Sequence, residues 1–190
     1  MQNKEKMRCG WASNDQIYID YHDNEWGKPQ FDSVKLFEKI CLEGQQAGLS
    51  WITVLKKRDE YRRCFFDFDP TKIIKIDNIE PYMANAGLIR NKLKINAIIK
   101  NAHAYLNMQA NGEDFSQFIW SFVDGKPIIN HYHSLSDIPA STEISDRLSK
   151  ALKKKGFTFV GSTICYAFMQ SMGLVNDHLT NCFCYHNSQA

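Results

Sequence analysis

The sequence predicts an all-α protein, and three observations carry that prediction. Apolar residues recur at helical spacing through most of the 190 residues. Asp, Asn or Ser precedes several of these stretches and glycine follows several, as at helix ends. Alternating β-branched runs are scarce. The length suits one compact domain, which we place at residues 9–186 as two helical lobes sharing one core. Residues 1–8 are expected to be a disordered extension and residues 187–190 a tail.

The first half of the chain contains four predicted helices. Residues up to about Pro29 are rich in Gly, Asn and Asp and are expected to be irregular. A helix is predicted over 32–48, with Asp32 or Ser33 as its cap, and a second helix begins at Ser50. Two short helices are predicted within 69–76 and 77–87, each preceded by Asp or Asn.

The second half continues the helical pattern. A long amphipathic helix is predicted over 90–112 and stops at an Asn-Gly pair, and another follows over 113–123. Residues 124–142 read as a loop, the best place for any extended segment. Two further helices, 145–156 and 163–173, are joined by the short stretch "FTFVGS".

Composition excludes several classes of protein. No run of about 18 apolar residues exists, so neither a transmembrane helix nor a membrane partner is expected. The N-terminus has no apolar signal region, which favours a cytoplasmic protein. The six cysteines therefore indicate free thiols or a metal site. A net charge of +2 says little about nucleic acid, but basic clusters lie at 55–58 and 149–156.

A candidate metal site combines the two ends of the chain. His178 and Cys182 are four residues apart, which on a helix would place both on one face. Together with Cys9 and His22 they would form a closed, structural two-Cys, two-His zinc site.

Spacing alone leaves alternatives to this ligand set. The cysteines could be small buried apolar residues. Cys184 and His186 could also compete as ligands.

The segment "KKGFTFVGSTICYAFM" has the layout of helix, tight turn and helix. Gly156 and Gly161 bracket the turn, where a Cβ would obstruct a positive φ or a close backbone approach. The exposed N–H groups of the following helix, flanked by Lys153–Lys155, suit a duplex phosphate. The alternative is an ordinary helical corner with a basic surface.

A candidate ligand pocket is suggested by "CLEGQQAGLSW". Glu43 lies among apolar residues near a glycine-bounded turn, where a carboxylate can act in recognition or as a general base. Five aromatic residues in the N-terminal part could line a slot for a planar base, although such rings are more often core. They are Trp11, Tyr18, Tyr21, Trp26 and Trp51.

Taken together, these motifs resemble the bacterial DNA-3-methyladenine glycosylase I family, of the helix-hairpin-helix superfamily. The resemblance runs from about Cys9 to Tyr185. It is carried by "RCGW", "YHDNEWG", "LFEKICLEGQQAGLSWITVLKKR" and "GFTFVGSTICYAFMQSMGLVNDH" in this order, and by the trailing Cys.

The resemblance implies a fold, a metal and a set of site residues. The fold would be a helix-hairpin-helix glycosylase in which one structural zinc joins the N- and C-terminal segments. The zinc ligands would be Cys9, His22, His178 and Cys182. The base pocket would comprise Tyr21, Glu43 and Trp51, with Trp11 and Tyr18 nearby and Glu43 as the candidate catalytic residue. Trp26 is expected to pack beneath the segment, outside the site. The DNA-binding hairpin would comprise Gly156, Phe157, Val160, Gly161, Ser162 and Thr163.

One departure from the superfamily bears on mechanism. Relatives carry a catalytic Asp two residues before a His, and aligned on His178 that position holds Asn176, with Asp177 shifted by one. No Lys stands at Ser162–Thr163, where relatives capable of lyase chemistry place one. The resemblance therefore implies a monofunctional enzyme without the strong base of its relatives.

The implied reaction is release of 3-methyladenine from alkylated double-stranded DNA, which leaves an abasic site. Free 3-methyladenine would be both product and inhibitor, and the protein is expected to be a monomer. Two alternatives are a non-catalytic DNA-binding protein with the same zinc site and a structural zinc protein. Glu43 and the clustered aromatics argue against the first, because phosphate binding needs neither.

Overall fold

The computed structural model describes residues 6–12 and 14–187, with side chains as far as Tyr185. Most of the described chain is helical, as the sequence predicts. The larger helices are α1 (Gln16–Asn24), α2 (Ser33–Gln45), α3 (Trp51–Cys64), α6 (Lys92–Ala110), α8 (Glu143–Lys154) and α9 (Ser162–Ser171). The shorter helices are α4 (Pro70–Ile73), α5 (Glu80–Ala84), α7 (Phe115–Trp120) and α10 (Cys184–Asn187). Single 3-10 turns lie at Phe66–Phe68, Ser121–Val123 and Leu135–Asp137.

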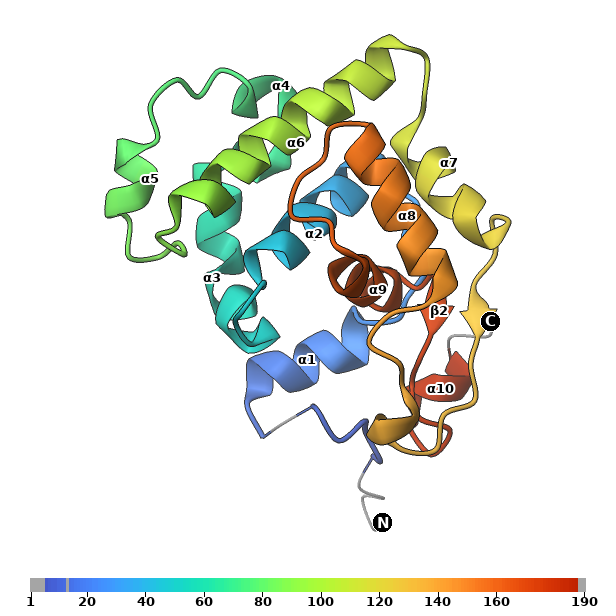
Figure 1. The fold of residues 1–190 in the computed structure, drawn as a ribbon. Coiled ribbons are helices and arrows are strands. Elements are labelled where there is room, and N and C mark those ends of the chain that lie inside the picture. Colours follow the sequence, from blue (N-terminus) through green and yellow to red (C-terminus); the bar gives the residue numbers. More distant parts are fainter. Residues whose placement is uncertain (1–5, 13, 188–190) are drawn as a thin grey trace.

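Helix α2 runs through the middle of the molecule (Figure 1), with α3 and α6 on one side and α8 and α9 on the other. It begins where the sequence predicts, because the Asp32 side chain accepts a hydrogen bond from the Lys35 N–H. Its last seven residues, Lys39 to Gln45, are all buried, so no face of this half of α2 meets solvent. Two charged side chains, Lys39 and Glu43, are carried into the interior with it.

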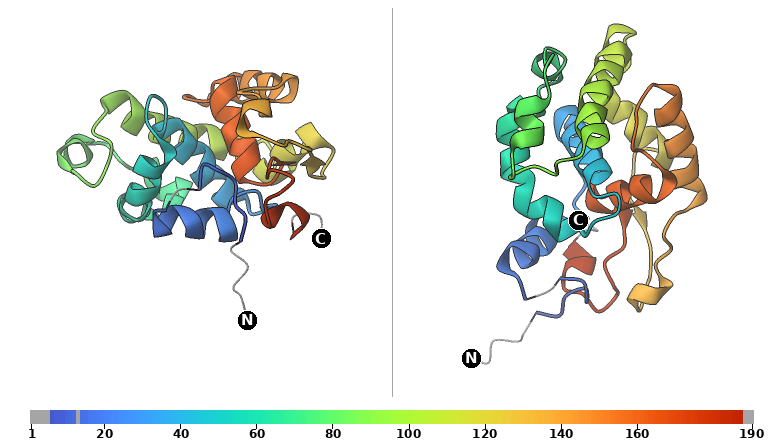
Figure 2. Two further views of the ribbon diagram at one scale, coloured as in Figure 1. Left: turned by 90° about the horizontal axis from the view of Figure 1, so that it is seen from below. Right: turned by 60° about the vertical axis from the view of Figure 1, so that its left-hand side comes forward.

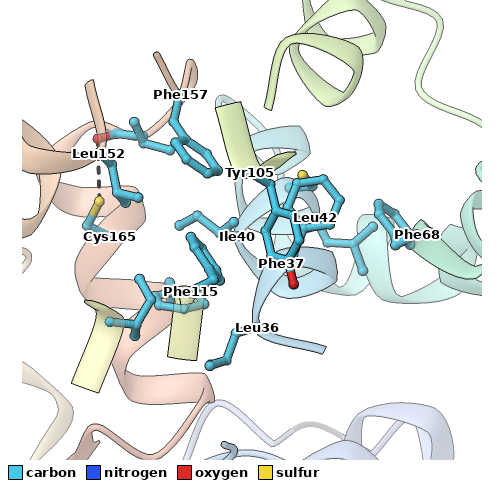
Figure 3. Packing of buried hydrophobic residues seen from close by; sticks show 14 of the residues in the cluster. Leu36, Phe37, Ile40, Leu42, Phe68, Tyr105, Phe115, Leu152, Phe157 and Cys165 are labelled. Atoms are coloured by element: carbon cyan, nitrogen blue, oxygen red, sulfur yellow. Dashed lines mark hydrogen bonds between the residues drawn. The ribbon is translucent and has the colours of Figure 1, made fainter. Parts of the chain in front are cut away.

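One hydrophobic cluster draws side chains from both sides of α2. Figure 3 shows Phe37 and Ile40 of α2 between Tyr105 and the turn at Phe68 on one side and Leu152, Phe157 and Cys165 on the other. The rings of Phe37 and Tyr105 lie 5.1 Å apart. This shared core rigidly joins α2 to the α8–α9 pair.

The N-terminal region differs from its prediction, because residues 16–24 form α1 and are not irregular. Asp15 caps this helix by accepting from the Ile17 N–H. Only Tyr21 and His22 of α1 are buried, and they are adjacent in sequence. A helix that buries two neighbours shows no apolar repeat of 3.6 residues, so periodicity could not reveal it.

The segment from His178 to Cys182 also differs, since it is a turn and not the expected helix. The Cys182 N–H donates to the Leu179 carbonyl at 2.8 Å. The side chain of Asn176 accepts from the His178 N–H and donates to the Tyr185 carbonyl. These bonds close the turn locally, and α10 begins only at Cys184.

Two short strands pair in parallel, β1 (Ile128–Ile129) with β2 (Val175–Asn176). The first lies in the predicted loop, where an extended segment was most expected, and the second was not predicted. The pair brings the C-terminal segment against the middle of the chain (Figure 2).

The N- and C-terminal segments also meet, because the Phe183 N–H donates to the Met7 carbonyl. Within the N-terminal segment, Arg8 forms an ion pair with Asp23. Residues 7 and 8 of the expected disordered extension therefore make defined contacts. Of the predicted tail at 187–190, the first residue is the last of α10, and residues 188–190 lie outside the described residues, as do residues 1–5. No helix of the described chain is both long and apolar enough to cross a lipid bilayer.

Candidate functional site

A cavity of about 210 Å³ opens between α1, α2, α3 and α9. All five residues predicted for the base pocket line it, namely Trp11, Tyr18, Tyr21, Glu43 and Trp51. Five further residues complete the wall, and the sequence analysis did not include them in the site: Trp26, Gln46, Ile138, Ala167 and Gln170. Trp26 therefore belongs to the pocket, which corrects the expectation that it only packs beneath.

Aromatic rings form most of the cavity wall. Trp51 and Tyr21 lie 5.7 Å apart between ring centroids, and Trp11 lies 5.1 Å from Tyr18 and 5.0 Å from Trp26. The indole Nε1 of Trp51 is buried and has no hydrogen-bond partner within the described part of the chain. Rings at these spacings suit a flat, aromatic ligand.

Glu43 supplies a carboxylate to this aromatic wall. Its side chain is almost fully buried, and burial raises the pKa of Glu43. The ammonium of Lys39, one helical turn earlier, lies 3.4 Å from Oε1 and opposes that shift. The carboxylate is thus half of a buried ion pair and not an isolated negative charge.

Lys39 is the functional residue that sequence reasoning missed. Its Nζ donates to the Tyr21 hydroxyl at 2.5 Å and lies 3.6 Å from the ring centroid of Trp51. Burial lowers the pKa of Lys39 to about 8, although Glu43 favours the charged form. In sequence, Lys39 and Glu43 look like an ordinary surface pair at i and i+4. The available signal was the apolar "LFEKICLEG" surrounding them, which indicates a helix buried on all sides.

The four predicted metal ligands lie together beside the pocket. Cys9, His22, His178 and Cys182 are all buried, and their ligand atoms lie within 4.8 Å of one another. Cys182 Sγ is 3.5 Å from His22 Nε2 and 3.6 Å from His178 Nδ1, and Cys9 Sγ is 3.6 Å from His178 Nδ1. A tetrahedral zinc with bonds of about 2.3 Å to sulfur and about 2.05 Å to nitrogen has S–N edges of roughly 3.5 Å. The spacing and the donor types fit such an ion.

The outward-facing nitrogen of each imidazole has a partner, as expected around a metal. His22 Nδ1 lies 2.8 Å from a carboxylate oxygen of Asp23, and His178 Nε2 lies 3.1 Å from the Trp26 carbonyl. Gly27 permits the second contact: its φ is +79°, and a Cβ there would lie 2.9 Å from His178 Nε2. Hydrogen bonds from Cys184 and Cys9 lower the pKa of the Cys182 thiol.

Of the competing ligands, Cys184 lies in a second possible group with His22 and Asp23. The side chain of His186 lies outside the described residues. The first group contains the two-Cys, two-His donor set that zinc prefers, so it is the better candidate.

The turn between α8 and α9 buries two of its apolar side chains and leaves Phe159 half-buried. Phe157 and Val160 are 2% and 1% exposed, so they anchor the turn in the core and do not face outward. Ser149 Oγ donates to the Val160 carbonyl, which fixes the loop to α8. Gly156 has a φ of +98°, as expected for a position that favours glycine.

Gly161 is a different case from Gly156. It caps α9 with an ordinary φ of −61°, and a Cβ there would have no neighbour within 4 Å. Neither a positive φ nor a close approach of another part of the chain therefore requires glycine at this position. Thr163 is exposed beside it, and the Ser162 hydroxyl bonds to Asp146.

The lysines beside the turn are not equivalent. Lys153 and Lys154 are exposed, whereas Lys155 pairs with Glu113 at 2.5 Å. All three lysines lie beside the turn, as expected, but Lys155 is already engaged in an ion pair. The anion site itself stays a prediction.

Comparison with known proteins places this architecture. The sequence profile described as methyladenine glycosylase matches residues 11–185. The chain belongs to the methyladenine glycosylase family.

Two curated members of the family are similar over nearly their whole length. The DNA-3-methyladenine glycosylase of Haemophilus influenzae is 64% identical over 179 residues, which cover 93% of this chain and 97% of that protein. The DNA-3-methyladenine glycosylase 1 of Escherichia coli is 62% identical over 180 residues, which cover 94% and 96%.

Solved structures agree with this family. A crystal structure of 3-methyladenine DNA glycosylase I superposes with a TM-score of 0.93 at 62% identity, over 94% of this chain and all of that one. A variant 3-methyladenine DNA glycosylase I in complex with 3-methyladenine superposes with a TM-score of 0.88 at 38% identity, over 93% and 96%.

Within this glycosylase fold, Asp177 does not line the pocket. It is completely buried and accepts hydrogen bonds from Asn130, Tyr166 and Gln170 at 2.7, 2.5 and 2.9 Å. Of these three described partners, Gln170 alone lines the cavity. The side chain of the neighbouring Asn176 bonds to the Tyr185 carbonyl and the His178 N–H, which closes the turn after β2.

Proposed function

We propose that this protein hydrolyses the N-glycosidic bond of 3-methyladenine in alkylated double-stranded DNA, releasing the free base and leaving an abasic site. The observation that carries the proposal is the aromatic cavity with one buried carboxylate, Glu43, in a chain more than 60% identical to named DNA-3-methyladenine glycosylases. The activity would make it a base-excision repair enzyme with free 3-methyladenine as product and inhibitor.

The pocket's chemistry suits recognition more than acceleration. Extruding the lesion costs a few kcal/mol, and stacking the base against Trp51 offsets about 1–3 kcal/mol of that cost. Glu43 would accept from the exocyclic amino group of the base. Because Lys39 already balances the carboxylate, the cationic lesion meets a polar pair and not a bare negative charge.

The bond to be broken needs little help from the protein. In DNA, 3-methyladenine is a cation, so the electrons of the glycosidic bond move to the base and it leaves neutral. Water forms the new bond to the sugar carbon and loses its proton to solvent. No strong base is required at the cavity, and Asp177 does not reach it. The enzyme is monofunctional in this proposal, because no lysine stands at Ser162–Thr163 to form a Schiff base.

We also propose one structural zinc, held by Cys9, His22, His178 and Cys182. Four protein ligands would close the coordination shell and leave no open position for a substrate. When bound, the ion would supply cross-linking between the chain ends and no reaction chemistry. The buried two-Cys, two-His set and its S–N distances support this assignment.

The α8–α9 turn is the proposed DNA contact, as a helix-hairpin-helix element. Unpaired N–H groups at the start of α9 and the exposed Lys153 and Lys154 would bind backbone phosphate. The open space beside Gly161 supports a reason for glycine outside the protein, where a phosphate would approach. Leu49, 38% exposed in the loop between α2 and α3, is the best candidate to enter the gap left by the extruded base.

A non-catalytic DNA-binding protein remains the second candidate, since the hairpin would serve it equally. One experiment decides between them. The protein is incubated with duplex DNA carrying 3-methyladenine, and released base is measured by chromatography. We expect free 3-methyladenine, abasic sites and no covalent adduct after borohydride treatment. DNA binding without any released base would contradict the enzymatic proposal.

A further inference from the structure

Lys39 joins three of the residues that line the base pocket. Its Nζ donates to the Tyr21 hydroxyl at 2.5 Å, lies 3.4 Å from Glu43 Oε1 and lies 3.6 Å from the centroid of the Trp51 ring. The side chain is only 4% exposed. A lysine that is buried usually serves a defined partner, because desolvating an ammonium is costly.

The bond to Tyr21 has a fixed direction. An ammonium carries three donors and no acceptor, so the Tyr21 oxygen must accept from Lys39. The phenolic proton must then be donated elsewhere. Tyr21 lines the cavity, and within the described chain its hydroxyl has only this one hydrogen bond. The proton is therefore available to an acceptor on a ligand.

The ion pair between Lys39 and Glu43 makes Glu43 a hydrogen-bond acceptor beside the Tyr21 donor. An ionised carboxylate only accepts hydrogen bonds, and the Lys39 ammonium favours this ionised form despite burial. Tyr21 then offers a donor to the pocket, and Glu43 offers an acceptor beside it. Adenine carries the complementary edge, an N7 acceptor beside an N6 donor, whereas guanine carries two acceptors, N7 and O6.

We propose that Lys39 is a positioning residue that sets this donor–acceptor order and thereby selects alkylated adenine over alkylated guanine. The inference rests on the proposed glycosylase function and deepens it. Lys39 acts through Tyr21 and Glu43 and does not itself line the cavity.

Loss of the proton from Lys39 would reverse the direction of its hydrogen bond with Tyr21. Its pKa is lowered to about 8 by burial, with Glu43, Arg58 and Glu25 as the charged groups that also act on it. A neutral amine can accept a hydrogen bond, so above that pH the Tyr21 hydroxyl can turn to Lys39 and away from the ligand. Binding of 3-methyladenine is then expected to weaken as the pH rises through about 8.

The chain provides a matched control for the burial of a lysine. Lys94 is 6% exposed, and its Nζ donates to the carbonyl oxygens of Gln45 and Ala47 at the end of α2. Both of these bonds go to backbone oxygens, so neither involves a side chain of the pocket wall. Replacing it tests the cost of losing a buried lysine without touching Tyr21 or Glu43.

The test compares Lys39→Met and Lys94→Met with the native protein by calorimetric binding of free 3-methyladenine and 3-methylguanine from pH 6.5 to 9.5. We expect Lys39→Met to bind 3-methyladenine about tenfold or more weakly, as for loss of a hydrogen bond to a charged group. Its preference over 3-methylguanine should fall, and the decline near pH 8 should vanish. Lys94→Met should keep both the preference and the decline.

A cycle with Tyr21→Phe separates positioning from general packing. If Lys39 acts through the Tyr21 hydroxyl, the two substitutions together should cost less than the sum of each alone. Additive losses, or a native affinity that stays flat through pH 8, would overturn the inference. If Lys39→Met does not fold, Tyr21→Phe alone decides, because it should bind without the decline that the native protein shows. A native protein that binds no 3-methyladenine would instead contradict the proposed function.

Discussion

The Cys/His cluster and the base pocket lie side by side, and two successive residues of α1 each contribute to one of them. Tyr21 of α1 turns toward the pocket, and His22 turns toward the cluster. Successive residues on a helix point about 100° apart, so one short helix serves both sites. The cluster gathers four buried side chains with matched donor atoms, whereas the pocket leaves a cavity among unlike groups. Anchoring the cluster therefore also anchors one wall of the pocket.

The difference teaches how each kind of site can be found. A metal site is specified by residue type, because few side chains can serve as ligands and all four are needed. A binding pocket is specified by the balance of donors, acceptors and charge. In this protein that balance depends on Lys39, whose burial follows from the packing around α2.

The largest effect should come from the cluster. Cys182→Ser removes one of four proposed ligands, so we expect loss of stoichiometric zinc and a fall of more than about 3 kcal/mol in the free energy of unfolding. Elemental analysis and thermal unfolding measure both. The matched control is Cys184→Ser, a buried neighbour that should keep its zinc. Unchanged zinc and melting temperature in Cys182→Ser would contradict the ligand assignment.

The next effect should come from the pocket and leave the cluster intact. Glu43→Gln removes the charged acceptor, which is worth about 1.5–3 kcal/mol and predicts a loss of base release of roughly 10- to 100-fold. Zinc content should not change. Near-normal release of 3-methyladenine by this variant would show that the carboxylate is not a recognition group.

The same variant should show a characteristic pH dependence of stability. Without Glu43, the pKa of Lys39 falls further below its usual value of 10.5, so the folded variant binds fewer protons than the unfolded chain. Its stability should then rise as the pH increases toward 10.5. The deficit relative to the native protein should thus be larger at pH 6 than at pH 9, as measured by urea unfolding. A deficit independent of pH would mean that the two side chains are not coupled.

Asp177 lies between the two regions, next to His178 in sequence and bonded to Gln170 of the pocket. The Asp177 carboxylate accepts three hydrogen bonds, and in Asp177→Asn the amide NH2 group would face donors and lose some of them. We therefore expect a loss of about 1–3 kcal/mol in the free energy of unfolding. Activity per folded molecule should stay within a few-fold, with zinc retained. Abolished base release at full zinc content would instead identify Asp177 as a catalytic base.

The smallest effect should be at the hairpin, outside both regions. Lys153→Gln should lower the salt dependence of DNA binding by about one unit of slope, as for one lost phosphate contact. Lys155→Gln should change it less, because Lys155 is already paired with Glu113. Binding of free 3-methyladenine should be unaffected in both. Equal slopes for the two variants would indicate that the Glu113 pair opens on DNA.

Much of the architecture was predictable from local sequence. The cap at Asp32 and the stop after Ala110 follow from the chemistry of helix ends, and α2, α3, α6, α8 and α9 lie where periodicity and glycine spacing predict them. Family-level motifs indicated the aromatic pocket, Glu43 and the four clustered Cys and His residues, all of which the structure brings together. Such features depend on residue type and on neighbours within a few positions.

Other features were decided only by the tertiary structure. Helix α1 buries two adjacent residues against different partners and has no periodic signal. The turn at His178–Cys182 is held by Asn176 and Tyr185, and a strand at Val175 pairs with a segment more than forty residues earlier. Above all, Lys39 looks like a surface residue in the sequence, but in the structure it is buried because helices cover α2 on several sides. Sequence alone determined which groups this protein has, whereas packing determined which are desolvated, and desolvation sets the strength and direction of their interactions.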